Sequence, residues 1–189
     1  MMRPARRLTR GGEDASPTWS RDGRMIAFQR VDRVMAVSVA NGRVRAIARG
    51  GDPAWSPDGR LIALTDGRAL AVVRPTGSGR RVLYRAPVSP NANTELLDPV
   101  WHPGGRSLAV RVVVTHSRSV DERAVIVQRR GGRARTAACF GLTTWSPDGR
   151  WVACVFLGRI LVFSTRGGKP TDLTRGSQPS WRPRSRAPR

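Results

Sequence analysis

The segment Pro53–Leu64 reads PAWSPDGRLIAL, and close copies of it recur along the chain. Three segments align with it in full: PTWSRDGRMIAF from Pro17, PVWHPGGRSLAV from Pro99 and TTWSPDGRWVAC from Thr143. A fifth, PSWRPRSR from Pro179, keeps only the beginning. Their tryptophans are 36, 46, 44 and 36 residues apart. Self-similarity at a period of about 40 residues is typical of a repeat architecture.

Each repeat carries a tryptophan and then a tight turn. Proline fixes the backbone at the first central turn position, aspartate suits the second, and glycine takes the positive φ that closes a hairpin. We assign a structural role to these residues. They are Trp19, Trp55, Trp101, Trp145 and Trp181, Asp22, Asp58 and Asp148, and Gly23, Gly59, Gly105 and Gly149.

Four strands, A to D, are predicted in each repeat, and strand A ends at the tryptophan. Strand B is predicted at Met25–Gln29, Leu61–Thr65, Ser107–Val114 and Trp151–Phe156. Strand C is predicted at Val34–Val39, Ala69–Val73, Ala124–Gln128 and Ile160–Ser164, and strand D leads to the next repeat. Arg6–Thr9 is expected as a leading strand D, Pro179–Trp181 as a trailing strand A, and Glu95–Leu97 as a short turn.

Strands B and C are apolar on both alternations, as in MIAF, LIAL and WVACVF. A strand with one wet face would alternate, so both faces of these sheets are expected to be covered. Small four-stranded sheets stacked face to face at this period make a β-propeller. The sequence therefore predicts an all-β fold, a propeller of four-stranded antiparallel blades with four complete repeats and partial strands at both termini. The repeated tryptophans are expected to fill the wedge between blades.

The motif P-x-W-S-P-D-G-R-x-I-A-F, with a distal Leu-Thr at Leu8 and again at Leu173, resembles the WD-like propeller repeat of TolB-type proteins. It also resembles propeller domains that precede peptidase domains of the prolyl oligopeptidase kind. The TolB resemblance implies binding of lipoprotein or peptide partners. TolB-type rings have six blades, which need about 243 residues at this repeat length, whereas this chain holds four full repeats. We expect a single propeller over residues 1–181 and a basic disordered tail over 182–189.

Of the 189 residues, 34 are basic and 13 acidic, a formal charge of +21. All the basic residues except Lys169 are arginine, which is typical of codon bias in a GC-rich genome, so net charge alone does not predict a nucleic-acid partner. No apolar run approaches the ~18 residues of a membrane span. The basic start has no apolar segment behind it, so we expect no signal peptide and, by default, a cytoplasmic location. If the reading frame is incomplete at its N-terminus, a periplasmic or extracellular location would be expected instead.

The sequence offers little for catalysis. No G-x-S-x-G nucleophile motif occurs. His102 takes the place of the turn serine in WHPGG and is expected to be a surface turn residue. His116, near Asp121, lies in a long loop at Thr115–Arg123, where exposure explains it better than general-base chemistry. The repeated aspartates suit their turns better than they suit calcium. No catalytic, cofactor-binding or metal-ligating residue is predicted, and no cofactor.

Three further residues carry structural expectations. Cys139 and Cys154 could be neighbours in space, and two buried reduced thiols are favoured over a disulfide. Trp151 has no counterpart in the other repeats and is interpreted as local core filling.

In an up-and-down blade the A–B and C–D turns share one face of the disk, which we call the turn face. By this assignment the turn face carries thirteen basic and three acidic residues, and the opposite face carries ten and nine. Part of this asymmetry follows from turn chemistry, since polar residues follow glycine at strand starts. A functional basic face would attract an acidic partner with an on-rate that falls as salt rises. The candidate binding residues are Arg24, Arg43, Arg60, Arg80, Arg106, Arg133, Arg150 and Lys169.

The expected function is a non-catalytic scaffold that binds a protein or peptide, with an acidic partner favoured by the turn face. Two alternatives stay open: the accessory propeller of a peptidase-like enzyme that lacks its catalytic domain, and a polyanion or nucleic-acid binder. Nucleic acid is not the favoured partner, because the tryptophans that could stack on bases are assigned to blade packing. Unpaired strands at the two ends predict either an incomplete ring whose ends lie near each other or self-association through them.

Overall fold

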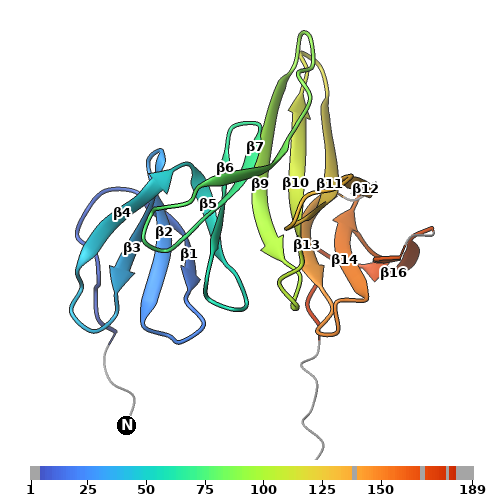
Figure 1. The fold of residues 1–189 in the computed structure, drawn as a ribbon. Coiled ribbons are helices and arrows are strands. Elements are labelled where there is room, and N and C mark those ends of the chain that lie inside the picture. Colours follow the sequence, from blue (N-terminus) through green and yellow to red (C-terminus); the bar gives the residue numbers. More distant parts are fainter. Residues whose placement is uncertain (1–4, 138–139, 167–168, 178, 182–189) are drawn as a thin grey trace, which may run out of the picture.

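The computed structural model describes residues 5–137, 140–166, 169–177 and 179–181, and the side chains of these residues except 137 and 140–143. It contains four four-stranded antiparallel sheets, each built from four consecutive strands (Figure 1). The fold is an all-β propeller with four blades, as the repeats predict. None of the described residues forms a helix long and apolar enough to cross a membrane.

The strands follow one another in order within each blade. Blade 1 contains β1 (Asp14–Trp19), β2 (Met25–Arg30), β3 (Arg33–Ser38) and β4 (Val44–Arg49). Blade 2 contains β5 (Gly51–Trp55), β6 (Ile62–Asp66), β7 (Ala69–Val73) and β8 (Arg81–Arg85). Blade 3 contains β9 (Asn93–Trp101), β10 (Ser107–Thr115), β11 (Val120–Gln128) and β12 (Arg135–Ala137). Blade 4 contains β13 (Phe140–Trp145), β14 (Trp151–Phe156), β15 (Arg159–Ser164) and β16 (Thr171–Arg175).

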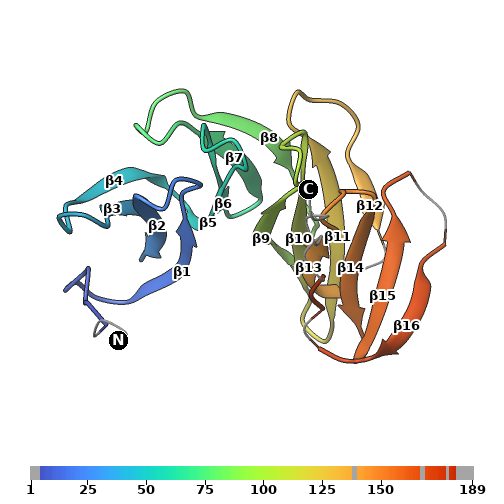
Figure 2. The same cartoon turned by 90° about the horizontal axis from the view of Figure 1, so that it is seen from below.

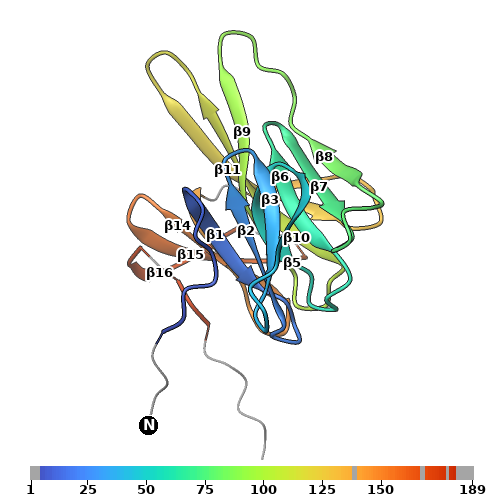
Figure 3. The same ribbon diagram turned by 90° about the vertical axis from the view of Figure 1, so that its left-hand side faces the viewer.

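The blades follow an arc that is open between blade 1 and blade 4 (Figure 2). The A–B turns lie at the lower end of the blades in Figure 1, and the β10–β11 hairpin projects from the opposite end. Figure 3 shows the same hairpin extending beyond the shorter turns of blades 1 and 2.

The A–B turn is fixed by its own side chains. In blade 2 the Ser56 hydroxyl donates to Asp58 Oδ1 at 2.6 Å, and the backbone N–H of Arg60 donates to the same oxygen at 3.1 Å. The N–H of Leu61 in turn donates to Ser56 Oγ at 2.9 Å. Gly59 closes the turn at a φ of +70°, in the left-handed region that favours glycine. Blades 1 and 4 repeat these contacts with Ser20 and Asp22 and with Ser146 and Asp148.

Strand A of each blade contains an irregularity before its tryptophan. The pairing of β1 with β2 shifts between Ala15 and Thr18, and the pairing of β5 with β6 shifts between Gly51 and Ala54. The residue three positions before the tryptophan has positive φ in blades 1, 2 and 3, where it is Ser16, Asp52 and Asp98. A bulge of this kind bends a strand and re-aims the side chains that follow it.

The hydrophobic core lies between blades, because each sheet is apolar on both faces. One cluster joins blades 1 and 2, where Ala27 and Val34 meet Ile62 and Leu64. The other two clusters join blade 2 to blade 3 and blade 3 to blade 4. Continuous apolar strands are thus explained by burial on both sides.

The insertions and the chain ends differ from the sequence-based expectations. Thr115–Arg123 is not a long loop: β10 and β11 stay paired as far as Thr115 and Val120, because alternate residues such as Val112 and Val114 remain buried. Glu95–Leu97 is part of β9 rather than a turn. Arg6–Thr9 and Pro179–Trp181 form no strand, because blades 1 and 4 already hold four strands each. The tail 182–189 lies outside the described residues.

Candidate functional site

The repeat tryptophans connect each blade to the one before it. The indole Nε1 of Trp101 donates to the carbonyl oxygen of Ala54 at 2.9 Å. Trp145 donates to Val100 at 3.1 Å, and Trp181 donates to Thr144 at 3.3 Å. Each acceptor is the residue directly before the tryptophan of the preceding repeat. The strand A ends therefore form a regular series of contacts around the arc.

The first tryptophan departs from the expected wedge role. Trp101 and Trp145 are 7% and 6% exposed, whereas Trp19 is 58% exposed because no blade of the described chain precedes it. The wedge prediction is wrong for Trp19. Trp55 packs between blades 1 and 2, but its Nε1 is buried without an acceptor among the described residues.

His102 is buried, at 5% exposure, so its expected role as a surface residue is wrong. Its Nδ1 accepts the backbone N–H of Gly104 at 2.8 Å, which completes the turn of blade 3 where the other blades use serine. Its ring meets Trp145 of blade 4 edge-on, with 4.9 Å between ring centroids. Burial lowers the pKa of His102 below its usual value, and the nearby Arg106 charge lowers it further, against a hydrogen bond with the Gly149 backbone that raises it. His102 is therefore a neutral residue that joins blades 3 and 4.

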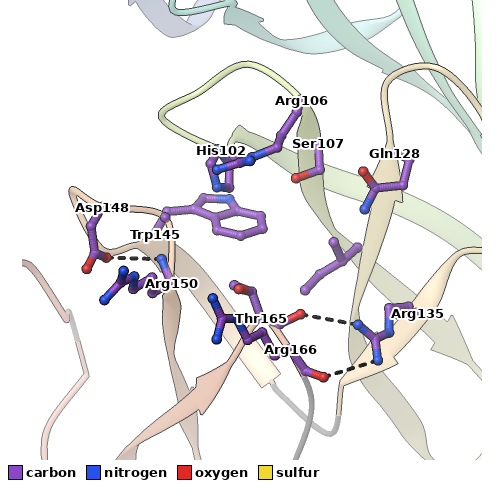
Figure 4. A pocket seen from close by; sticks show the side chains of 12 residues that line it. His102, Arg106, Ser107, Gln128, Arg135, Trp145, Asp148, Arg150, Thr165 and Arg166 are labelled. Carbon is purple, nitrogen blue, oxygen red and sulfur yellow. Dashed lines mark hydrogen bonds between the residues drawn. The ribbon is translucent and has the colours of Figure 1, made fainter.

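A groove opens above this contact on the turn face, with a volume of about 620 Å³. We call it the 3/4 groove. Figure 4 shows the Trp145 indole in the middle of its lining, with His102 and Arg106 on one side and Arg150 and Arg166 on the other. The residues that line it are His102, Arg106, Ser107, Ile126, Gln128, Arg135, Trp145, Asp148, Gly149, Arg150, Thr165 and Arg166.

Four arginines and one carboxylate set the charge of the 3/4 groove. Arg135 is held in place, because its guanidinium donates to the carbonyl oxygens of Thr165 and Arg166 at 3.2 and 3.4 Å (Figure 4). The carboxylate of Asp148 accepts from Ser146 Oγ and from the Arg150 backbone. The groove thus has an excess of guanidinium groups, the side chains best suited to bind carboxylates in two-pronged contacts.

Two predicted face residues, Arg106 and Arg150, line this groove, whereas the others are spread over the turns. Arg24, Arg43, Arg60, Arg133 and Lys169 are all exposed. Arg80 differs from its assignment to a free basic face, because it pairs with Asp66 at the end of β6 at 2.8 Å.

The sequence analysis counted Arg166 among the basic residues of the turn face but did not select it as a binding residue. It missed Arg135, because β12 carries no repeated motif. The predicted turn residues Asp22, Asp58, Asp148, Gly23, Gly59, Gly105 and Gly149 lie in the four A–B turns.

Charge also connects the turns of neighbouring blades. Arg129, after β11, pairs with Asp58 of blade 2 at 3.2 Å, and its carbonyl accepts from the Arg81 guanidinium at 2.5 Å. The Ser56 hydroxyl, and to a smaller extent Arg129, hold the pKa of Asp58 below its usual value. The repeated aspartate thus mainly stabilises its own turn, and its ion pair with Arg129 adds a weaker contact between blades.

Other singled-out residues lie away from the groove. His116 Nε2 is 3.3 Å from Asp121 Oδ2 near the tip of the β10–β11 hairpin, where the Asp121 side chain is 68% exposed. Cys154 is buried in β14 and disulfide-bonded, so the expectation of a reduced thiol is wrong for it, and Cys139 lies outside the described residues. Trp151 is 43% exposed, so it is not core filling.

Comparison with known proteins gives a fold and no family. No protein-family model matches the sequence, and no curated protein matches it significantly. Among solved structures, the β-propeller domain of Cps50 (Swd1) from Myceliophteria thermophila aligns with a TM-score of 0.65 at 14% identity, over 89% of this chain and 57% of that one. Oligogalacturonate lyase in complex with manganese gives 0.64 at 14% identity, over 84% and 52%. Acylaminoacyl peptidase from Pyrococcus horikoshii gives 0.60 at 11% identity, over 86% and 32%.

These similarities establish the β-propeller fold. The chain spans about half the length of the Cps50 domain and of the lyase. The similar proteins include a lyase and a peptidase, so they do not separate catalytic from non-catalytic roles.

Proposed function

We propose that this chain is a non-catalytic β-propeller scaffold, of the TolB-like kind that its repeat motif resembles, and that it binds an acidic protein or peptide through the turn face. The 3/4 groove is the centre of this surface. The observation that carries the proposal is the convergence of Arg106, Arg150 and Arg166 on one open groove beside Trp145.

The geometry suits an extended acidic segment. Among the described residues, none of these three guanidinium groups has a hydrogen-bond acceptor or a carboxylate partner. Their N–H groups could therefore donate hydrogen bonds to an incoming carboxylate. The buried contact between His102 and Trp145 lies beneath these arginines and joins the two blades that carry them. Because blades 3 and 4 fix the backbones that carry the arginines, little ordering is needed on binding.

The test is binding of a labelled peptide rich in aspartate and glutamate, measured by fluorescence anisotropy. We expect the triple variant R106E/R150E/R166E to lose affinity at least about tenfold, because reversal turns three attractions into repulsions. The control is R33E/R85E/R118E, which reverses three exposed arginines outside the turn face and the groove. Equal loss in both variants would contradict the proposal.

A second probe, measured at two salt concentrations, distinguishes binding of an acidic peptide from general binding of polyanions. A short single-stranded oligonucleotide of equal charge is measured beside the peptide at about 50 and 200 mM salt, the range over which phosphate binding falls steeply. The proposal expects the peptide to bind more tightly than the oligonucleotide at the higher salt. Tighter binding of the oligonucleotide, with loss in both triple variants, would instead indicate a general polyanion binder.

A further inference from the structure

A second groove lies between blades 1 and 2, at the same place in the repeat as the 3/4 groove. We call it the 1/2 groove, and its volume is about 480 Å³. Trp55, Asp58 and Pro75 line it at the repeat positions that Trp145, Asp148 and Thr165 occupy in the 3/4 groove. The two grooves are thus equivalent parts of the fold, and any difference between them comes from their side chains.

The balance of charge differs between the two grooves. The 1/2 groove is lined by one arginine, Arg21, and by two carboxylates, Asp22 and Asp58. The 3/4 groove is lined by four arginines and by one carboxylate, that of Asp148. The repeat motif therefore does not by itself produce an arginine-rich groove. The excess of positive charge is particular to the contact of blades 3 and 4.

The additional arginines of the 3/4 groove stand outside the repeated motif. At the repeat position of Arg166, blade 2 has Thr76 and blade 1 has Ala40, neither of which is charged. Arg135 comes from β12, and its guanidinium donates to the carbonyl oxygen of Arg166 at 3.4 Å (Figure 4). Arg135 thus holds the backbone of Arg166 while the Arg166 side chain stays exposed.

The other two arginines of the groove are also exposed side chains on a fixed backbone. The carbonyl oxygen of Arg106 accepts from the backbone N–H of Arg129 at 2.9 Å. The N–H of Arg150 donates to Asp148 Oδ1 at 3.0 Å. Three guanidinium groups from two blades can therefore gather around one anion without a rearrangement of the backbone, which lowers the cost of binding.

Three guanidinium groups in one groove favour an anion that concentrates its charge. In an extended peptide neighbouring side chains point to opposite sides, so only alternate residues, about 6.6 Å apart, face the groove. A glutamate then brings one negative charge at each such step. A phosphorylated serine or threonine brings between about 1.5 and 2 negative charges and three acceptor oxygens on one side chain. Arginine binds such a phosphate in two-pronged contacts.

We propose that the residue of the partner that enters the 3/4 groove is a phosphoserine or phosphothreonine, with Arg106, Arg150 and Arg166 around its phosphate. This inference rests on the proposed function and defines the partner more closely. A nucleic acid fits the groove less well. The two aromatic side chains of the lining, His102 and Trp145, are 5% and 6% exposed, so they offer no face on which a base could stack.

The test compares three forms of one labelled peptide in which glutamates flank a central serine. The serine is phosphorylated, replaced by glutamate or left unchanged, and binding to the full chain is measured by fluorescence anisotropy. We expect the phosphorylated form to bind at least about tenfold more tightly than the glutamate form, because its one side chain contacts several guanidinium groups. The variant R106Q/R150Q should remove most of this difference.

The matched control is R24Q/R60Q. Arg24 and Arg60 stand at the same repeat position as Arg106 and Arg150, and they are exposed. They are not among the described residues that line either groove. The control should therefore keep the preference for the phosphorylated peptide. An equal loss of the preference in both double variants would overturn the proposal.

The pH dependence of binding gives a second readout. The second pKa of a phosphoserine is about 6, whereas glutamate has a pKa of about 4.3. Between about pH 7.5 and pH 5.5 the phosphorylated peptide takes up a proton, and the glutamates stay ionised. The affinity of the phosphorylated form should therefore fall toward that of the glutamate form. The glutamate form reports any change in the groove itself over the same range.

The remaining outcomes separate this inference from the proposed function. Equal binding of the phosphorylated and glutamate forms, with both lost in R106E/R150E/R166E, would overturn the phosphate preference and leave the acidic partner standing. Binding of neither form would contradict the proposed function as well. Free phosphoserine that competes as well as the peptide would indicate a small phosphorylated compound, and tighter binding of an oligonucleotide of equal charge would indicate a nucleic acid. Either result would overturn the proposal.

Discussion

The indole Nε1 of Trp145 donates a hydrogen bond to the carbonyl oxygen of Val100, 3.1 Å away on the neighbouring blade. Trp101 makes the same bond one blade earlier, and Trp181 makes it one repeat later. A residue that repeats for structural reasons thus also sets the spacing of the blades. The 3/4 groove lies on this contact, because Trp145 is both a blade link and part of its lining.

Burial predicts which tryptophan matters for stability. Trp145→Ala should lower the free energy of unfolding by about 3–5 kcal/mol, as for other buried aromatic side chains. Trp19→Ala should change the free energy of unfolding by less than about 1 kcal/mol, because that side chain is largely exposed. Urea denaturation measures both. Equal losses would show that the two tryptophans are equally buried.

The hydrogen bond itself can be separated from the ring. Trp145→Phe keeps an aromatic ring and removes the donor to Val100, so it should cost about 1–2 kcal/mol. Trp55→Phe removes a buried N–H that has no acceptor among the described residues, so its cost should be clearly smaller. Denaturation curves of the two variants provide the comparison. A larger loss from Trp55→Phe than from Trp145→Phe would contradict the assigned contacts.

Two glycines with the same backbone geometry should respond differently to alanine. Gly23 and Gly149 both have φ of +69°, but a Cβ on Gly23 meets nothing within 4 Å, whereas one on Gly149 would lie 2.0 Å from His102 Nε2. Gly23→Ala should cost about 1–2 kcal/mol from backbone strain alone. Gly149→Ala should cost clearly more, because buried His102 cannot move aside freely.

A second substitution tests whether a clash with His102 causes the larger stability loss of Gly149→Ala. Adding His102→Ser, the residue that the other complete turns use, should bring the cost of Gly149→Ala down toward that of Gly23→Ala. Thermal unfolding of the single and double variants measures this coupling. An unchanged cost in the His102→Ser background would remove the steric explanation.

His102 should make stability depend on pH. Its folded pKa lies below the ordinary value of 6.5, so the folded state favours the neutral ring. Its contribution is therefore complete above about pH 6.5 and is lost as pH falls from there through the lowered pKa. The midpoint of urea unfolding should decrease over this range, and His102→Ser should flatten the decrease. His116→Ser is the matched control, because His116 lies near a hairpin tip, away from the contact between blades 3 and 4. The decrease in the unfolding midpoint at low pH should remain in that variant.

The local features of the fold could be predicted from the sequence. The turn of blade 2 depends on Ser56, Asp58 and Gly59, which lie within four residues, so the repeated letters are enough to identify it. The extent of β9 was not predictable in the same way. Its early residues pair with the far end of β10, and this pairing depends on the long hairpin rather than on their own composition.

The sequence by itself determined the blades, because strands, hairpin turns and the tryptophan position follow from contacts between residues close in the chain. Only the tertiary structure decided which equivalent residues are buried and which are exposed. Trp19 and Trp145 stand at the same repeat position, yet within the described residues only Trp145 has a preceding blade to bury it. Likewise, Arg106, Arg150 and Arg166 come from turns up to 60 residues apart and share one groove because blades 3 and 4 stack. The burial of a tryptophan and the grouping of distant arginines depend on how the blades stack. The repeat motif describes a single blade, so it cannot predict either of them.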